Sequence, residues 1–188
     1  MIQIKKPARA QNICKMKYKD AIKKSMEMLA QDDRFKFLGY NVRYGSMAYG
    51  TLRDVQDKCI ETPLAENLMA DLAIGLSLEG YRPVVFFERQ DFILNSLDAV
   101  VNHMDKIDSM SNGQFKTPVI LRATVGAKSI LNPGPQHTQD FSEVFKKLIK
   151  FPVIELNSAS QILKEYERAR DADYPIMFIE RRELYESE

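Results

Sequence analysis

The feature that most constrains the fold is a series of short apolar runs separated by segments with helical spacing. The runs lie at residues 35–38, 59–60, 84–87, 119–122, 153–156 and 176–179. Short apolar runs of this kind are typical of buried strands. The intervening segments predict helices at residues 21–29, after Pro63, at 92–110, at 142–149 and at 160–170. This alternation predicts an α/β fold, doubly wound, with a mainly parallel sheet and helices on both faces.

Length and composition predict one main globular unit. The chain has 188 residues, of which 45% are hydrophobic, so it can bury a sizeable core. Residues 1–16 carry Lys5, Lys6, Arg9 and Lys15 with little apolar pattern. We therefore expect an N-terminal arm over residues 1–16 and a single domain over residues 17–188.

Charge and cysteine usage exclude several function classes. The formal net charge of +1 gives no overall electrostatic reason to bind nucleic acid or a membrane surface. No stretch approaches the roughly 20 apolar residues of a membrane span, and the start lacks the apolar core of a secretory signal, so we expect a cytoplasmic protein. Cys14 and Cys59 fit reduced thiols, and two histidines do not make a zinc site, so no metal ligands are predicted.

Glu66 is the most informative single residue. Thr62-Pro63 is a signal for the start of a helix, which places Glu66 in the first helical turn. The following residues are apolar nearly all round and predict an interior helix: Leu68, Met69, Ala70, Leu72, Ala73, Ile74, Gly75, Leu76 and Leu78. A carboxylate here either offsets the positive end of the helix dipole or has a raised proton affinity suited to chemistry.

Three loops are candidates for ligand binding, because ligands of such folds bind outside the carboxyl ends of the strands. The first, residues 40–51, contains Gly45 and Gly50, which can adopt backbone angles closed to other residues. A flexible surface loop is the alternative. The second and third span residues 86–92 and 126–138.

Several motifs occur together and in order over residues 17–186. They include Leu38-Gly39-Tyr40-Asn41-Val42, Glu61-Thr62-Pro63-Leu64-Ala65-Glu66, Gly80-Tyr81-Arg82-Pro83-Val84, Asp91-Phe92-Ile93, Thr117-Pro118-Val119-Ile120-Leu121-Arg122 and Tyr174-Pro175-Ile176-Met177-Phe178-Ile179-Glu180. This pattern resembles the pyrimidine-binding domain of the beta subunit of thiamine-diphosphate-dependent 2-oxoacid dehydrogenases, in the transketolase superfamily.

The resemblance implies a task for Glu66. The matching glutamate hydrogen-bonds a ring nitrogen of the cofactor's aminopyrimidine and shifts the ring toward its imino form, which takes the proton from the thiazolium carbon. Leu64 and Phe92 are implied cofactor contacts, with Phe92 packing on the ring; ordinary core packing is the alternative for Phe92. Arg89 stands where many relatives have another aromatic residue. It can stack on the ring, mark a changed substrate pocket, or pair with Glu88 or Asp91.

His137 is the second implied catalytic residue. It matches the second of two histidines that dehydrogenase relatives carry in a glycine-rich loop, and the first has no counterpart here. Histidine is suited to proton transfer at neutral pH. A structural or solvated histidine is the alternative. Tyr40-Asn41 also departs from the acidic residues that relatives usually carry.

The resemblance further implies a partner. The sequence has no Gly-Asp-Gly motif for metal and diphosphate and ends before the carboxyl-terminal domain of family beta subunits. We therefore expect an alpha-type, diphosphate-binding subunit that holds Mg²⁺, in a pair of heterodimers. The expected function is a subunit of a split thiamine-diphosphate enzyme, an oxidoreductase or transferase acting on a 2-oxo acid. A transketolase-like or carboligase half acting on a ketose and a noncatalytic assembly or regulatory homologue are the alternatives.

Overall fold

The core of the chain is one parallel sheet. The computed structural model describes residues 16–126 and 132–187. Within them, six strands lie in the order β2-β1-β3-β4-β6-β5, and every neighbouring pair is parallel. The strands are β1 (Phe35–Gly39), β2 (Cys59–Glu61), β3 (Arg82–Phe87), β4 (Ile120–Val125), β5 (Val153–Leu156) and β6 (Ile176–Arg181). Each predicted apolar run is a strand, displaced by no more than a few residues at its ends.

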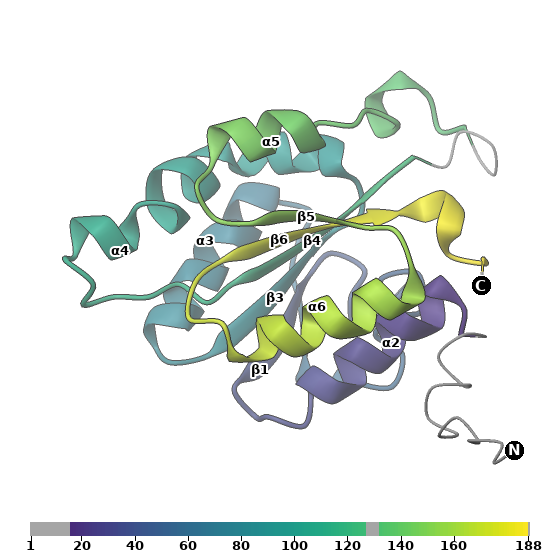
Figure 1. The fold of residues 1–188 in the computed structure, drawn as a ribbon, viewed down its shortest axis with the longest axis horizontal. Helices are drawn as coiled ribbons and strands as arrows, with labels where there is room; N and C mark the ends of the chain where they lie inside the picture. Colours follow the sequence, from purple (N-terminus) through teal and green to yellow (C-terminus); the bar gives the residue numbers. More distant parts are fainter. Residues whose placement is uncertain (1–15, 127–131, 188) are drawn as a thin grey trace, which may run out of the picture.

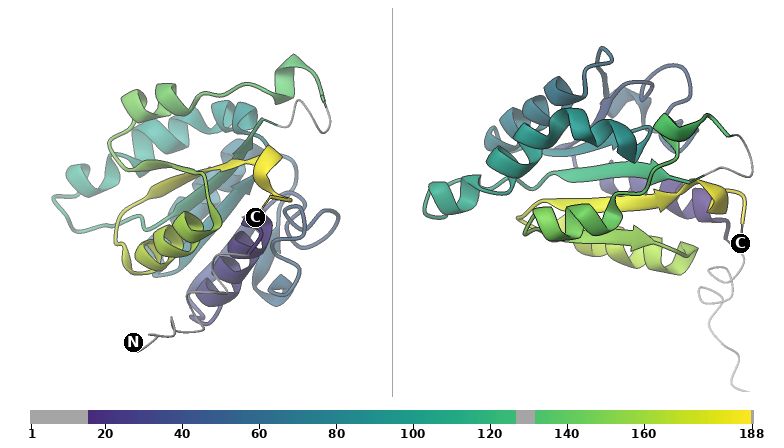
Figure 2. Two further views of the ribbon diagram at one scale, coloured as in Figure 1. Left: turned by 45° about the vertical axis from the view of Figure 1, so that its right-hand side comes forward. Right: turned by 90° about the horizontal axis from the view of Figure 1, so that it is seen from above.

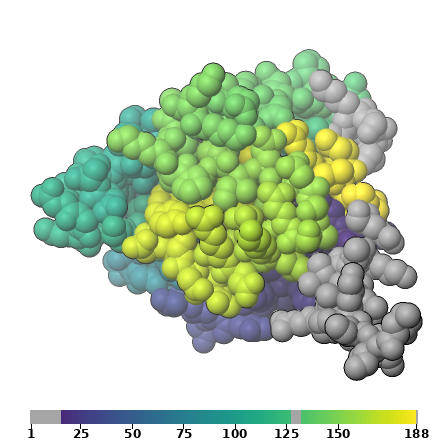
Figure 3. Space-filling view, viewed as in Figure 1, coloured from purple at the N-terminus to yellow at the C-terminus, as the bar shows by residue number. Residues whose placement is uncertain are grey.

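Helices cover both faces of the sheet (Figures 1 and 2). On one face α2 (Tyr18–Leu29) packs beside α6 (Ala159–Asp171). The other face carries α3 (Glu66–Leu78), α5 (Ser142–Leu148) and three consecutive helical segments, namely the 3₁₀ helix η2 (Gln90–Ser96), the π-helix η3 (Asp98–Met104) and the short α4 (Ile107–Met110). Shorter 3₁₀ turns are η1 (Gln56–Lys58), η4 (Pro135–His137) and η5 (Arg182–Leu184). In the space-filling view the region around α4 projects from one end of the molecule (Figure 3).

Alternate residues of the strands pack into two separate hydrophobic cores, one on each face of the sheet. Phe86 and Phe178 pack with α2 and α6 on one face, whereas Phe87 and Ile179 pack with α3 and η3 on the other. This period-2 alternation follows from strand geometry, in which successive side chains point to opposite faces. The predicted doubly wound α/β fold is therefore confirmed.

Two predictions about helices were wrong in detail. Residues 92–110 were expected to form one long helix, but they form η2, η3 and α4 in succession. The hydroxyl of Ser96 donates to the carbonyl of Glu66 at 2.6 Å, so the first of these segments follows the start of α3 rather than a straight helical path. The second error concerns α3, which buries only one face, with Leu68 and Leu78 46% and 45% exposed.

The expected N-terminal arm lies outside the described residues except for Met16, as does Cys14. Tyr18 and Ser187 lie together, because the amide of Tyr18 donates to the carbonyl of Ser187 at 2.9 Å. No helix in the described part of the chain is both long and apolar enough to cross a membrane.

A fully buried ion pair joins β4 to β6. Nε of Arg122 lies 2.7 Å from Oε1 of Glu180, and both side chains are 0% exposed. Glu180 also accepts from the hydroxyls of Tyr185 (2.5 Å) and Tyr166 (3.4 Å), and Arg122 donates to Oγ1 of Thr51 at 3.1 Å. Burial disfavours the charged guanidinium, but the charge of Glu180 outweighs it and raises the pKa of Arg122. Arg122 is therefore positively charged in the folded protein.

Replacing one member of this pair should destabilise the fold strongly. Arg122→Met leaves the Glu180 carboxylate buried without its counterion, so we expect the free energy of unfolding to fall by roughly 3–5 kcal/mol. Urea denaturation followed by circular dichroism measures the change. Arg168→Met is the matched control, since Arg168 is 65% exposed and its pair with Glu165 is long, at 4.0 Å. Equal stability of the two variants would contradict the assigned role of the buried pair.

Candidate functional site

The candidate site lies at the carboxyl ends of β1, β2 and β3. Gly39 pairs with both Glu61 and Phe86 in the sheet, so the three strands end at about the same level. A small hollow opens above them. It is lined by Tyr40, Leu64, Glu66, Met69, Phe86, Phe87, Glu88 and Phe92. The structure thus brings together three of the sequence-predicted site residues, Leu64, Glu66 and Phe92.

Glu66 is the first residue of α3 and faces this hollow. Its Oε2 accepts from Nδ2 of Asn95 at 3.3 Å, and its main-chain carbonyl accepts from Ser96. Both partners belong to η2, so this segment fixes the carboxyl group in place. The helix start favours a negative charge at the same position. The two interpretations of Glu66 from the sequence, helix-end stabilisation and chemistry, are thus compatible in one geometry.

Phe92 and His137 are in contact. Their ring centroids lie 5.2 Å apart and the rings are nearly perpendicular, at 88°, which is the edge-to-face arrangement. Phe92 is half-buried rather than a core residue and lines the hollow. His137 lies behind it, with Nδ1 buried and without a hydrogen-bond partner among the described residues. His137 therefore contacts Phe92, which lines the hollow, but does not line the hollow itself.

Arg89 does not line the hollow. Its guanidinium donates to the carbonyl of Gly126 at 3.2 Å, and the residue is only 8% exposed. Of its two expected ion-pair partners, Glu88 accepts from Asn41 and Ser46. Asp91 instead accepts from Gln139, on the segment that follows η4. Arg89 therefore ties the end of β3 to the end of β4.

The loop at residues 40–51 begins with Tyr40, which lines the hollow. Gly45 and Gly50 have φ values of +59° and +82°, as their expected conformational freedom requires. The carboxylate of Glu61 accepts from the amides of residues 41–44, and that of Glu88 accepts from Asn41 and Ser46. Neither carboxylate was predicted from the sequence as a loop anchor. Glu61 ends the strand that leads to Glu66, and Glu88 directly follows Phe87. Their positions next to candidate loops could have indicated that they bind a loop.

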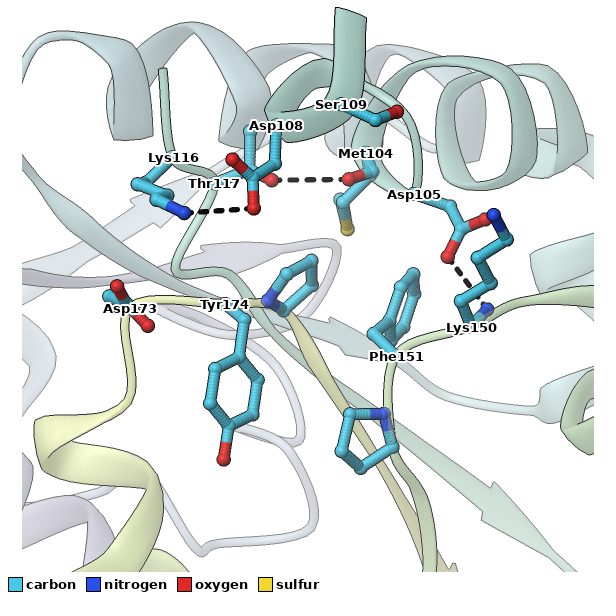
Figure 4. Close-up of a pocket in the computed structure, with 12 residues that line it drawn as sticks. Met104, Asp105, Asp108, Ser109, Lys116, Thr117, Lys150, Phe151, Asp173 and Tyr174 are labelled. Atoms are coloured by element: carbon cyan, nitrogen blue, oxygen red, sulfur yellow. Dashed lines mark hydrogen bonds and ion pairs between the residues drawn. The ribbon is translucent and has the colours of Figure 1, made fainter. Parts of the chain in front are cut away.

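A separate cavity lies at the other edge of the sheet (Figure 4). It has a volume of about 430 Å³ and is formed at the amino ends of β4, β5 and β6, by residues that precede these strands. Its apolar wall includes Phe151 and Tyr174. Its charged groups are already paired in part, because Asp108 binds Lys116 at 2.8 Å and Asp105 accepts from the amide of Lys150 at 2.7 Å. The cavity is at the opposite edge of the sheet from Glu66, where ligands of parallel sheets do not usually bind.

Comparisons of sequence give a consistent result. The family described as "Transketolase, pyrimidine binding domain" matches residues 15–188. The pyruvate dehydrogenase E1 component subunit beta of Rickettsia conorii (strain ATCC VR-613 / Malish 7) is 29% identical over 173 residues, which cover 89% of this chain and 52% of the relative. The mitochondrial counterpart from Saccharomyces cerevisiae is 30% identical over 176 residues, covering 90% of this chain and 48% of the relative. The chain spans about half the length of these curated relatives.

Comparisons of structure agree on the fold. A split gene transketolase, solved as an inactive beta4 tetramer, has a TM-score of 0.70 and 16% identity, covering 89% of this chain and 51% of that chain. A transketolase from Campylobacter jejuni subsp. jejuni NCTC 11168 has a TM-score of 0.67 and 16% identity, covering 87% of this chain and 25% of that chain.

The thiol of Cys59, at the start of β2, should be unreactive. It is 4% exposed, and burial followed by the negative charge of Asp57 raises the pKa of its thiol to about 12. The reactive thiolate is therefore scarce below about pH 11. In a Cys14→Ser variant at pH 8, we expect iodoacetamide to label Cys59 more than about a hundredfold more slowly in the folded chain than in urea. Mass spectrometry measures both rates, and equal rates would contradict the expectation.

Proposed function

Because the chain belongs to the family of transketolase pyrimidine-binding domains, we propose that it is the pyrimidine-binding subunit of a split thiamine-diphosphate-dependent enzyme. The observation that carries the proposal is the placement of the Glu66 carboxyl group in a hollow with apolar walls at the carboxyl edge of the sheet. Glu66 would hydrogen-bond a ring nitrogen of the aminopyrimidine and hold or share a proton there. The half-buried ring of Phe92 and the side chain of Leu64 would cover its flat faces.

The residues of the hollow fit this group chemically. An aminopyrimidine is a flat ring with hydrogen-bonding atoms on its edge, and it needs apolar surfaces together with a fixed polar group. Met69 and Phe86 supply buried apolar surface, and Asn95 fixes the orientation of the Glu66 carboxyl. When bound, thiamine diphosphate supplies the nucleophilic carbon that attacks the carbonyl of a 2-oxo acid or ketose. His137 is a candidate for proton transfer behind Phe92, and Arg89 acts by fixing the strand ends rather than by stacking.

An exposed apolar surface supports a partner-built site. Leu64, which lines the hollow, is 67% exposed, and Leu68 on α3 and Leu94 on the contacting segment η2 are 46% and 40% exposed. Clusters of exposed apolar side chains beside a functional group are typical of protein interfaces. The proposed partner is an alpha-type subunit that binds the diphosphate and holds Mg²⁺, and two such heterodimers would form the complete enzyme, with the cytoplasm as its expected compartment. No cluster of three or more metal-binding side chains occurs in the described parts of this chain.

The reaction we propose is of the 2-oxoacid dehydrogenase or decarboxylase type, because the curated relatives given above are pyruvate dehydrogenase beta subunits. Calorimetric titration of thiamine diphosphate and Mg²⁺ into this chain, alone and mixed with a candidate partner, tests the proposal. Binding in the mixture alone supports a shared site. Absence of binding in the mixture, when the partner is known to fold, favours the noncatalytic alternative.

Glu66→Gln should abolish cofactor activation and leave the fold intact. The amide cannot hold or share the proton that a carboxyl group can, so we expect turnover by the reconstituted pair to fall by at least about a hundredfold. Steady-state kinetics with a 2-oxo acid measures the loss. Glu79→Gln, at the exposed other end of α3, is the control and should keep full activity. Near-normal turnover by Glu66→Gln would contradict the role of Glu66.

Leu68→Asp should weaken assembly with the partner. A charge at the centre of an apolar interface is costly to desolvate, so we expect the dissociation constant to rise by at least about tenfold. Sedimentation velocity of the mixture measures it. Met110→Asp is the matched control, because Met110 is 74% exposed but lies on α4, toward the amino edge of the sheet. Equal affinities of the two variants would place the interface elsewhere.

A further inference from the structure

Glu61 binds an unusual set of partners. Its Oε1 accepts from the amide of Asn41 at 2.7 Å, and its Oε2 accepts from those of Val42, Arg43 and Tyr44 at 3.0, 2.8 and 3.4 Å. Four consecutive backbone amides therefore converge on one carboxylate, which makes the loop backbone an anion-binding concavity filled by the chain's own side chain. Hydrogen bonds to a charged acceptor are stronger than neutral ones.

The remainder of the same loop is held in a strained conformation. Met47, Ala48, Tyr49 and Gly50 have φ values of +48°, +50°, +58° and +82°, so four consecutive residues are left-handed. Left-handed backbone costs roughly 1–2 kcal/mol for each residue other than glycine and persists only where the surroundings enforce it. Such strain concentrates at functional sites.

Side chains from several elements enforce this conformation. The hydroxyl of Tyr49 donates to the carbonyl of Glu88 at 3.2 Å, and its ring packs edge-on against Phe86. The guanidinium of Arg182 covers the same ring, 4.6 Å from its centroid. The loop end at Thr51 accepts a hydrogen bond from the buried Arg122. Glu61 thus anchors the beginning of a loop whose end is already locked to the core.

The loop matters to the site because of what it carries. Tyr40 lines the hollow together with Glu66, and Asn41 and Ser46 donate to Oε1 of Glu88, which lines it as well, at 3.2 and 3.3 Å. Glu61 also ends β2, five residues before Glu66. A single carboxylate therefore sets the position of one wall of the hollow relative to the segment that delivers Glu66.

We infer that Glu61 is a positioning residue of the cofactor site, which holds the loop at residues 40–51 as a preformed wall beside Glu66. Its role toward the cofactor rests on the proposed function, whereas its role in the loop does not. Without the carboxylate, the amides of residues 41–44 lose a charged acceptor, and the loop at residues 40–51 becomes less ordered. Binding of the cofactor must then order this loop each time.

The test has a readout in the chain alone. Hydrogen–deuterium exchange of Glu61→Gln should show amides 41–44 exchanging roughly tenfold or more faster than in the unaltered chain, while amides of α6 keep their rates. Glu66→Gln and Glu79→Gln are the controls and should leave amides 41–44 protected. Glu61→Asp, which keeps the charge but has a shorter reach, should give an intermediate rate, and it replaces Glu61→Gln if that variant does not fold. Unchanged exchange in both Glu61 variants would overturn the inference.

The second readout is cofactor affinity of the reconstituted pair. For Glu61→Gln we expect the dissociation constant of thiamine diphosphate to rise by about tenfold or more, with turnover at saturating cofactor retained, because the residue orders the site and does not transfer the proton. Loosened amides with unchanged affinity would overturn the role toward the cofactor. If the unaltered pair itself binds no cofactor, the proposed function and that role both fail, and the exchange data alone decide the role in the loop.

Discussion

The buried pair of Arg122 and Glu180 is the interaction on which the rest of the structure depends. Two charges taken out of water are tolerated only when their remaining hydrogen-bonding groups are satisfied. Here the satisfying groups come from distant parts of the chain, since Tyr166 belongs to α6, Tyr185 follows η5 and Thr51 ends the loop at residues 40–51. The pair therefore connects the sheet to α6 and to the loop at residues 40–51.

This arrangement links the stability of the core to the geometry of the site. The loop at residues 40–51 is fixed at one end by Arg122 through Thr51 and at the other by Glu61. The first anchor is wholly dry and the second is partly open to solvent. The loop is thus attached to the buried core at its end and to the end of β2 at its beginning. Preorganisation of this kind reduces the ordering cost that binding otherwise carries.

The sequence predicted what depends on local pattern. The six strands, the helix starting near Glu66 and the loops at the carboxyl edge follow from apolar periodicity and from Thr62-Pro63, and all are present. The grouping of Leu64, Glu66 and Phe92 required the family resemblance, because these residues come from two separate segments. Contacts between residues far apart in the sequence could not be predicted. Local sequence does not indicate that Glu61 binds the loop, that Asn95 binds Glu66, or that Arg89 binds the carbonyl of Gly126. The same limit explains why residues 92–110 looked like one helix, since the contact of Ser96 with Glu66 is tertiary.

The uncovered face of α3 has a consequence for how a cell must make this protein. Leu68 and Leu78 lie exposed on a helix whose opposite face is packed in the core, and Leu64 adds to the same apolar surface at its start. Copies in which this face is uncovered would expose apolar surface, which favours aggregation and recognition by chaperones and proteases. If the proposed partner covers this face, the amount of partner made would limit how much of the protein accumulates.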